Sequence, residues 1–322
     1  MQARTIFFSI LFGLSLAPAH AATATATPST LLTPPDPLTK PIASPYEAQW
    51  NRPQQPARIY GNTYYVGVGG LSVVLIHTEA GLVLIDGALP QSVAMIEASI
   101  RQLGFRVEDI KYILNTEAHF DHSGGIAALA RDSGAVVVAS PLGAQALRAG
   151  RVLEQDPQAG DIEPMPAVGK VSEIIDGGTV KLGATTITAH HMPGHTPGST
   201  SWTWVSCEAV GSSTGNPNTC LNVVFGASLN AVAADDFHFL ADANHGDLTP
   251  DFRRVINKFA SLPCDILITS HPDHSGADQK LAQLLAGVKP NPFIDPQACR
   301  KAAATFEARL EKRIAKEKAA AK

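Results

Sequence analysis

The chain has 322 residues, of which 45% are hydrophobic and 17% are charged, and its formal net charge is -4. A polypeptide of this length can bury roughly three quarters of its unfolded surface, so it can fold without disulfides or metals as structural staples. The composition excludes collagen, coiled coil and wholesale disorder, and the mild negative charge with 6% aromatic residues provides no basic groove for nucleic acid.

The first residues are typical of a secretory signal peptide. Arg4 precedes a mainly apolar run over 6–17, and the small residues Ala19 and Ala21 suit a cleavage site. The run is shorter than the about 20 residues that span a bilayer. We therefore expect residues 1–21 to be removed on export to the periplasm, with no membrane contact afterwards. The alternative is an uncleaved anchor, which the absence of a stop-transfer pattern disfavours.

Residues 22–45 are rich in Ala, Thr and Pro, which predicts a flexible leader. Residues 46–322 are predicted to form a single domain. Its first half begins with an antiparallel meander and then alternates helices and strands. The expected strands are 60–68, 72–77, 82–86, 110–115 and 135–139, and the expected helices are 89–103 and 123–131.

A second series of strands and helices begins near residue 171. The expected strands are 180–182, 185–190, 199–205, 221–225 and 266–270, with a helix over 250–261. Two successive sets of strands followed by helices predict two sheets face to face with helices outside, an α/β four-layer αβ/βα sandwich. The segment 295–322 carries Phe306, Leu310 and Ile314 at intervals of four, which predicts a helix packed on the body whose Lys-rich last turns fray.

Ligand-type side chains gather in three places, each next to a predicted strand. Glu117, His119, Asp121 and His122 follow the buried strand 110–115, and desolvating them together is costly unless a cation lies among them. His195 lies in the glycine-rich turn 192–199, and His271 follows the strand 266–270. Because strand ends converge on one cleft, these residues predict a metal site. His274 is close enough to His271 to support it.

These motifs resemble those of a known family. His119-Phe120-Asp121-His122, Gly194-His195-Thr196-Pro197-Gly198 and His271 are similar to the zinc-binding pattern of the metallo-β-lactamase superfamily, whose fold is an αβ/βα sandwich. The run from Gly194 through Trp202 and Trp204, together with Leu262-Pro263-Cys264 and His271-Pro272, resembles subclass B3 of the metallo-β-lactamases. The resemblance extends from about residue 55 to 310.

The resemblance implies two Zn(II) ions and six ligands. The first zinc would take Glu117, His119 and His195, and the second would take Asp121, His122 and His271. A carboxylate oxygen binds zinc at distances close to those of an imidazole nitrogen, so Glu117 can replace the usual first histidine, but its charge offsets part of the pull of the cation. The implied reaction is hydrolysis of the β-lactam amide bond by metal-bound hydroxide, with Asp121 orienting the nucleophile and no acyl-enzyme.

A second departure concerns substrate class. Relatives that cleave thioesters, lactones or phosphoesters carry an aspartate that bridges both metals, whereas the corresponding segment here, 223–230, has no carboxylate. The resemblance places Ser228 and Asn230 as contacts to the β-lactam substrate, a penicillin, a cephalosporin or a carbapenem. The alternatives are another hydrolase of the same fold, such as a lactonase, and a non-catalytic zinc-binding protein.

The four cysteines, Cys207, Cys220, Cys264 and Cys299, suit an exported chain with disulfide bonds. Sequence alone allows three pairings. The resemblance to B3 enzymes favours Cys264 with Cys299, which leaves Cys207 with Cys220.

Overall fold

The computed structural model describes residues 1–2, 5, 36–208 and 219–320. The chain divides into two compact units, Met1–Pro34 and Pro35–Lys322, and every described helix and strand belongs to the second. The predicted signal peptide, apart from residues 1, 2 and 5, lies outside the described residues, as do residues 22–35 of the predicted leader. Among the helices that are described, none is both long enough and apolar enough to cross a bilayer.

The first sheet has its strands in chain order, and in the described part of the chain they number seven. They are β1 (Ala57–Tyr60), β2 (Thr63–Tyr65), β3 (Val74–Thr78), β4 (Gly81–Ile85), β5 (Ile110–Leu114), β6 (Val136–Ala139) and β7 (Val171–Glu173). The strands β1 to β4 pair antiparallel, as predicted for the meander, and β4 to β7 pair parallel. The predicted strand 60–68 is a hairpin instead, because Gly61 takes a positive φ of 49° and turns the chain between β1 and β2.

The second sheet has the order β12-β11-β10-β9-β8. Its strands are β8 (Thr179–Leu182), β9 (Thr185–His191), β10 (Thr200–Cys207), β11 (Cys220–Gly226) and β12 (Ile266–Thr269). The strands β8 to β11 pair antiparallel, and β12 pairs parallel with β11. The second series of strands thus begins at β8 and not near residue 171, because β7 extends the edge of the first sheet.

Alternation along the strands explains why the two sheets face each other. Val74 and Ile76 of β3 point into a central core, where they meet Trp202 and Phe225 of the second sheet. Leu75, between them, points into a second core beneath the helices. Period-two side-chain alternation with both faces apolar is expected for a sheet covered on both sides.

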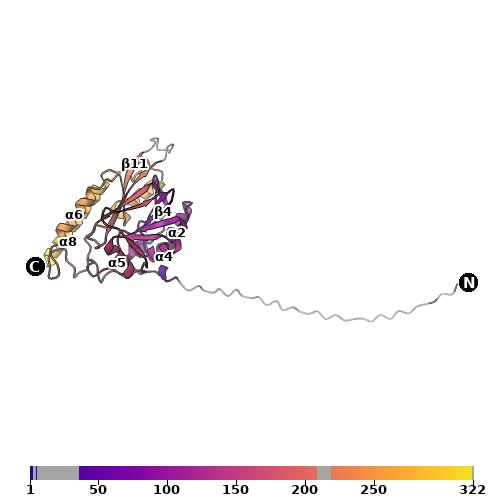
Figure 1. The fold of residues 1–322 in the computed structure, drawn as a ribbon, viewed down its shortest axis with the longest axis horizontal. Helices are drawn as coiled ribbons and strands as arrows, with labels where there is room; N and C mark the ends of the chain where they lie inside the picture. The colour runs from indigo at the N-terminus through magenta and orange to yellow at the C-terminus, as the bar shows by residue number, and fades with distance from the viewer. Residues whose placement is uncertain (3–4, 6–35, 209–218, 321–322) are drawn as a thin grey trace. The chain divides into compact units, whose positions relative to one another are not determined.

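Helices cover the outer face of each sheet, in the αβ/βα order that the sequence predicts. The cores under α2, α4 and α5 and under α6 and α8 are separate, and Figure 1 shows these two helix groups on opposite outer sides of the Pro35–Lys322 unit. The described α-helices are α1 (Glu47–Trp50), α2 (Val93–Gln102), α3 (Phe120–Ser123), α4 (Ile126–Ser133), α5 (Pro141–Ala149), α6 (Thr249–Ala260), α7 (Ala277–Leu285) and α8 (Ala298–Ala320). Short 3-10 helices are η1 (Pro37–Thr39), η2 (Pro90–Ser92), η3 (Val107–Asp109) and η4 (Pro272–His274).

Two terminal segments are more ordered than their composition predicts. Leu38 and Ile42, within the segment predicted to be a flexible leader, pack against the core under α4, and the Asp36 carboxylate pairs with Arg131 at 2.7 Å. At the other end α8 continues to Ala320, and Glu317 in its last turns is buried. Apolar packing of half-buried side chains and an ion pair thus extend the folded body toward the N-terminus. The buried Glu317 extends it toward the C-terminus.

Candidate metal centre

The loop that carries Glu117 and His119 leaves β5 and is held between the two sheets. The carboxylate of Asp86, at the end of β4, accepts hydrogen bonds from the backbone N–H of Thr116 at 2.7 Å and from its hydroxyl at 2.6 Å. From the second sheet, the Trp202 indole N–H donates to the carbonyl of Asn115 at 3.1 Å. These contacts fix the loop at the point where it enters α3.

Asp86 is a residue that the sequence analysis did not find. It is fully buried, has a positive φ of 65°, and burial raises the pKa of its carboxyl well above the usual value although Thr116 lowers it in part. The signal that could have found it is a lone acid directly after the apolar strand β4, where an unpaired carboxyl is costly.

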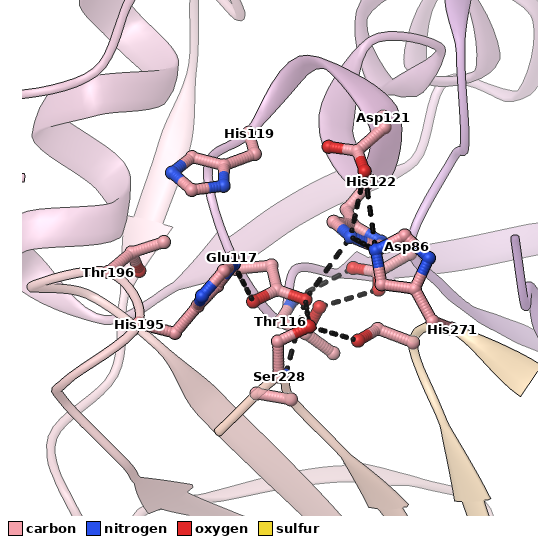
Figure 2. Close-up of polar contacts among 12 residues, drawn as sticks. Asp86, Thr116, Glu117, His119, Asp121, His122, His195, Thr196, Ser228 and His271 are labelled. Atoms are coloured by element: carbon pink, nitrogen blue, oxygen red, sulfur yellow. Dashed lines mark hydrogen bonds and ion pairs between the residues drawn. The ribbon is translucent and has the colours of Figure 1, made fainter. Parts of the chain in front are cut away.

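Asp121, His122 and His271 come together as three of the predicted ligands. His122 Nε2 lies 3.2 Å from His271 Nε2, and Asp121 Oδ2 lies 3.3 Å from His122 Nε2 and 3.4 Å from His271 Nε2. The three donor atoms fall within 4.8 Å of one another, which fits a shared metal ion. Figure 2 shows the two imidazoles and the carboxylate turned toward one another.

These separations agree with a tetrahedral zinc site. With zinc-ligand bonds of about 2.0–2.1 Å, neighbouring donor atoms are about 3.3 Å apart. Without a metal, one of these two imidazole nitrogens can donate an N–H to the other at 3.2 Å, and with a metal both can direct their lone pairs at the cation. The donor set and its spacing therefore fit a divalent metal. We call Asp121, His122 and His271 the aspartate trio.

Glu117, His119 and His195, which we call the glutamate trio, are more widely spaced. Glu117 is fully buried, and its Oε2 has no hydrogen-bond partner and lies 3.8 Å from His195 Nε2. The rings of His119 and His195 have centroids 5.0 Å apart. A buried carboxylate oxygen without a donor fits the presence of a cation.

Ser228 holds the other oxygen of Glu117. Its hydroxyl donates to Glu117 Oε1 at 2.9 Å and its backbone N–H does so at 3.3 Å, while its Oγ also lies 3.0 Å from Ser270 Oγ (Figure 2). Ser228 is fully buried. Its predicted role as a substrate contact stays a prediction, and what the structure gives it is a contact with Glu117.

In three of the imidazoles, one ring nitrogen faces an oxygen acceptor from outside the two trios, and this contact orients the ring. His195 Nδ1 faces the carbonyl of Asn230 at 3.0 Å, and His271 Nδ1 faces the carbonyl of Gly70 at 3.3 Å. His119 Nε2 faces the carboxylate of Asp156. Since these oxygens only accept, the facing nitrogen carries the proton and the other nitrogen is left as a donor atom for a metal.

The charges around the site favour metal-binding protonation states in both carboxylates and in His122. Burial lowers the pKa of His119 and of His271, but the carboxylates of Asp156 and Asp121, respectively, raise it overall. Burial raises the pKa of Glu117, but the imidazoles of His122, His195 and His119 lower it overall to about 2. Burial also raises the pKa of Asp121, yet His122 and His271 lower it overall. Burial lowers the pKa of His122 to about 4. Anionic carboxylates and a neutral imidazole are the forms that bind metal ions.

A cavity of about 340 Å³ opens above these side chains. His119, Asp121, His195 and His271 line it, whereas Glu117 and His122 are not among its lining residues. Its other walls include Trp50, Gln158, Ile162, Asn230 and Val232. The cavity therefore has a polar floor and walls of both polar and apolar side chains, as expected of a small-molecule site.

Asn230 and His274 lie together at the edge of this cavity. Asn230 Nδ2 is 3.0 Å from His274 Nε2, and Asn230 Oδ1 accepts from Arg309 of α8. Burial lowers the pKa of His274 to about 2, with the charges of His271 and Arg309 adding to the effect. The predicted contact of Asn230 with substrate stays a prediction, and His274 lies beside Asn230 and His271 without joining the aspartate trio.

Two disulfide bonds are formed, with the pairing that the resemblance implies. Cys207 bonds to Cys220, which joins the ends of β10 and β11. Cys264 bonds to Cys299, which joins the start of α8 to the segment before β12.

Comparisons with known proteins identify the family. The model of the metallo-β-lactamase superfamily matches residues 66–207. The solved Rm3 metallo-β-lactamase is 43% identical, with a TM-score of 0.80 over 86% of this chain and 100% of that chain. A second solved structure, described as the first B3 metallo-β-lactamase with an active-site glutamic acid, is 45% identical, with a TM-score of 0.78 over 88% of this chain and 99% of that chain.

A curated relative matches part of the chain. It is the uncharacterized protein YobT of Bacillus subtilis (strain 168), 33% identical over 145 residues, which are 44% of this chain and 59% of that protein. The solved structures, in contrast, are matched over nearly their whole length at more than 40% identity. The chain therefore belongs to the metallo-β-lactamase superfamily and, within it, to subclass B3.

Proposed function

We propose that this protein is a zinc-dependent β-lactamase that hydrolyses the amide bond of β-lactam rings and holds two zinc ions. The observation that carries the proposal is the convergence of six ligand-type side chains from three distant segments, four of which line one cavity, with the aspartate trio at tetrahedral spacing. The B3 relatives support the reaction class.

We assign the glutamate trio to one zinc ion and the aspartate trio to the other. The unpartnered Oε2 of Glu117, which lies 3.8 Å from His195 Nε2, supports the first assignment. So does the relative that is described as a B3 metallo-β-lactamase with an active-site glutamic acid. Bound zinc supplies Lewis acidity, which acidifies water and polarises a carbonyl.

The chain's own groups then have distinct tasks. Asp121 uses Oδ2 toward His122 and His271, so we assign its other oxygen, Oδ1, to accept a hydrogen bond from the attacking water. The hydroxyl of Ser228 is buried and donates to Glu117, so we assign the attack to water and not to this hydroxyl. Trp50, whose ring lies 5.5 Å from that of His271, covers one side of the cavity and limits the access of bulk water.

Hydrolysis of nitrocefin and of a carbapenem, followed spectrophotometrically, tests the proposal. A chelator should abolish hydrolysis and added zinc should restore it, whereas a serine-directed covalent inhibitor should have no effect. Turnover that survives thorough metal removal contradicts the zinc mechanism. Zinc binding without turnover of any β-lactam identifies a non-catalytic binding protein, and turnover of lactones alone identifies a lactonase.

We also propose that the protein acts in the periplasm after cleavage behind Ala21. The signal-like sequence and the two disulfide bonds support this location, because disulfides persist in oxidising compartments. N-terminal sequencing of protein released from a Gram-negative host by osmotic shock tests both the periplasmic location and the cleavage site. A chain that stays with the membrane and retains residues 1–21 contradicts the proposal.

A further inference from the structure

Asp156 lies behind His119 and contacts it with both carboxylate oxygens. His119 Nε2 is 3.2 Å from Asp156 Oδ1 and 3.1 Å from Oδ2. The two residues are 37 positions apart in the chain, and both are buried, with 2% of His119 and 3% of Asp156 exposed. Asp156 belongs to the long segment between α5 and β7.

This acceptor differs from those behind the other imidazoles. His195 and His271 each face a neutral backbone carbonyl, at 3.0 and 3.3 Å. Among the described residues, His119 is the proposed ligand whose distal nitrogen faces a charged acceptor. Hydrogen bonds to ionised acceptors are about twice as strong as neutral ones, and a carboxylate behind a ligating imidazole makes that ring a stronger donor.

The segment around Asp156 fixes the carboxylate in place. The backbone N–H of Gln158 donates to Asp156 Oδ1 at 2.9 Å, and the backbone N–H of Asp156 donates to Leu153 at 3.0 Å. The next residue, Pro157, accepts a hydrogen bond from Ala234 at 2.8 Å, which ties the segment to the chain beyond β11. The carboxylate therefore meets His119 from a rigid turn.

The two sides of this contact face different cavities. His119 lines the cavity of the metal centre, whereas Asp156 lines a separate cavity of about 770 Å³ with Pro157, Phe237 and Phe252. Figure 2 shows His119 with one ring nitrogen turned toward Glu117 and the other turned away from it.

We propose that Asp156 is a positioning residue for the glutamate trio, which fixes His119 in the tautomer that presents Nδ1 to a metal ion. The inference rests on the proposed function, since it assumes that His119 is a zinc ligand. In this trio Glu117 provides a carboxylate directly and Asp156 provides one through an imidazole. The trio thus has two anionic groups, one at the metal and one behind it.

A purely structural role for Asp156 is the competing explanation. If Asp156 served only to hold its own turn through the N–H of Gln158, its replacement would lower stability without acting on one metal site. The positioning role predicts a loss of zinc affinity at one of the two metal sites, and this loss should require His119. The structural role predicts neither.

The experiment compares zinc binding by competition with a chromophoric chelator in the full mature chain, without any assay of turnover. Asp156→Ala should weaken one of the two zinc equivalents by about 10- to 100-fold, the range for groups behind metal ligands, and leave the other unchanged. Asp156→Asn keeps the shape and an acceptor oxygen but loses the charge, so it should show a smaller loss at the same equivalent. Glu163→Gln, an exposed acid of the same segment, is the matched control and should bind zinc as the unmodified chain does.

A double-mutant cycle and a spectroscopic signature complete the test. In a His119→Ala background, Asp156→Ala should cause no further loss of zinc affinity, because it acts through the ring. In ¹⁵N spectra of the zinc-loaded chain, the Nε2–H signal of His119 should be present and should weaken in Asp156→Ala. Unchanged zinc competition in Asp156→Ala, or an equal loss in both backgrounds, overturns the inference. If Asp156→Ala does not fold, unchanged zinc competition in Asp156→Asn overturns the inference instead.

The outcome is separable from that of the proposed function. A chain that binds no zinc and hydrolyses no β-lactam refutes both proposals. A chain that binds two zinc ions and hydrolyses β-lactams, but whose Asp156 variants bind zinc normally, refutes the positioning role alone.

Discussion

The two ligand trios are built differently, although they share one loop. In the aspartate trio the donor atoms contact one another at 3.2 to 3.4 Å, so the metal-binding arrangement is already present in the side chains. In the glutamate trio Glu117 Oε2 lies 3.8 Å from His195 Nε2, whereas Glu117 Oε1 lies 3.3 Å from His122 Nε2 of the other trio, and each member of the glutamate trio is held from behind. Ser228 holds Glu117, Asp156 holds His119, and the carbonyl of Asn230 holds His195.

The difference shows where each trio gets its geometry. The aspartate trio depends on the ligands themselves, two of which lie in the short helix α3. The glutamate trio depends on supporting groups from the segment before β7 and the chain after β11. Changes to a ligand should therefore have the larger effect on the aspartate trio, whereas changes to supporting groups should act on the glutamate trio.

The largest expected effect comes from Asp121→Ala. Asp121 contacts both other members of its trio and is assigned to orient the attacking water, so turnover should fall by about 10²–10⁴-fold. Zinc stoichiometry should fall from two to one in the same variant. Steady-state nitrocefin kinetics and elemental analysis measure the two effects, and the exposed Asp161→Asn is the control. Two tightly held zinc ions in Asp121→Ala would show that Asp121 is not a ligand.

Glu117→His changes the ligand that distinguishes this chain from the usual superfamily pattern. We expect zinc retention in the glutamate trio to fall by about tenfold, because an imidazole cannot accept both hydrogen bonds that Ser228 directs at Oε1. Turnover should persist, since a neutral ligand leaves more of the cation's charge to polarise the substrate. Chelator competition and nitrocefin turnover are the measurements. If both are unaltered, Glu117 does not bind zinc.

The smallest expected effect on zinc binding comes from Ser228→Ala. Glu117 Oε1 loses its hydroxyl donor in a fully buried site, which should lower the free energy of unfolding of the metal-free chain by about 1–3 kcal/mol. Zinc affinity of the glutamate trio should fall less than tenfold. Both effects should be reduced in a Glu117→His background, which a double-mutant cycle of denaturant unfolding and chelator competition measures.

Ser206→Ala is the matched control for that variant. Ser206 is also fully buried and hydrogen bonded, but its partners Tyr60 and Asn62 lie away from the metal centre. It should lower stability and leave zinc binding unchanged. Equal zinc loss in the Ser206 and Ser228 variants would mean that the effect of Ser228 is general destabilisation.

Much of the fold could be predicted because its signals are local. Strand alternation, the buried runs before Asn115 and His271 and the apolar stripe of α8 follow from side-chain period alone. The hairpin at Gly61 was missed because the two short strands read as one continuous β-branched and aromatic run. The helices α5 and α7 were missed, although they are about as long and as amphipathic as α4; α5 contains Pro141 and Gly143 and α7 follows Gly276, and these residue types also mark loops.

The sequence predicted the ligand-type residues of the site but not the residues that hold them in place. Glu117, His119, Asp121 and His122 lie close together in sequence, so their clustering is visible without a structure. Asp86 and Asp156 are single acids 30 and 37 positions from their partners Thr116 and His119. A contact of that separation leaves no local pattern, and it becomes apparent only when the sheets and the long segment are assembled.

The last turns of α8 hold the segment between β11 and α6 in place. The carboxylate of Glu317 accepts the backbone N–H groups of Phe239 and Leu240 at 3.0 Å and pairs with Arg313 at 2.7 Å. Those N–H groups lie in the stretch that begins beside Val232 in the cavity wall. Trimming six or more residues from the carboxyl end would therefore spare every proposed zinc donor, but it would leave the N–H of Phe239, which lines the cavity of about 770 Å³, without its acceptor.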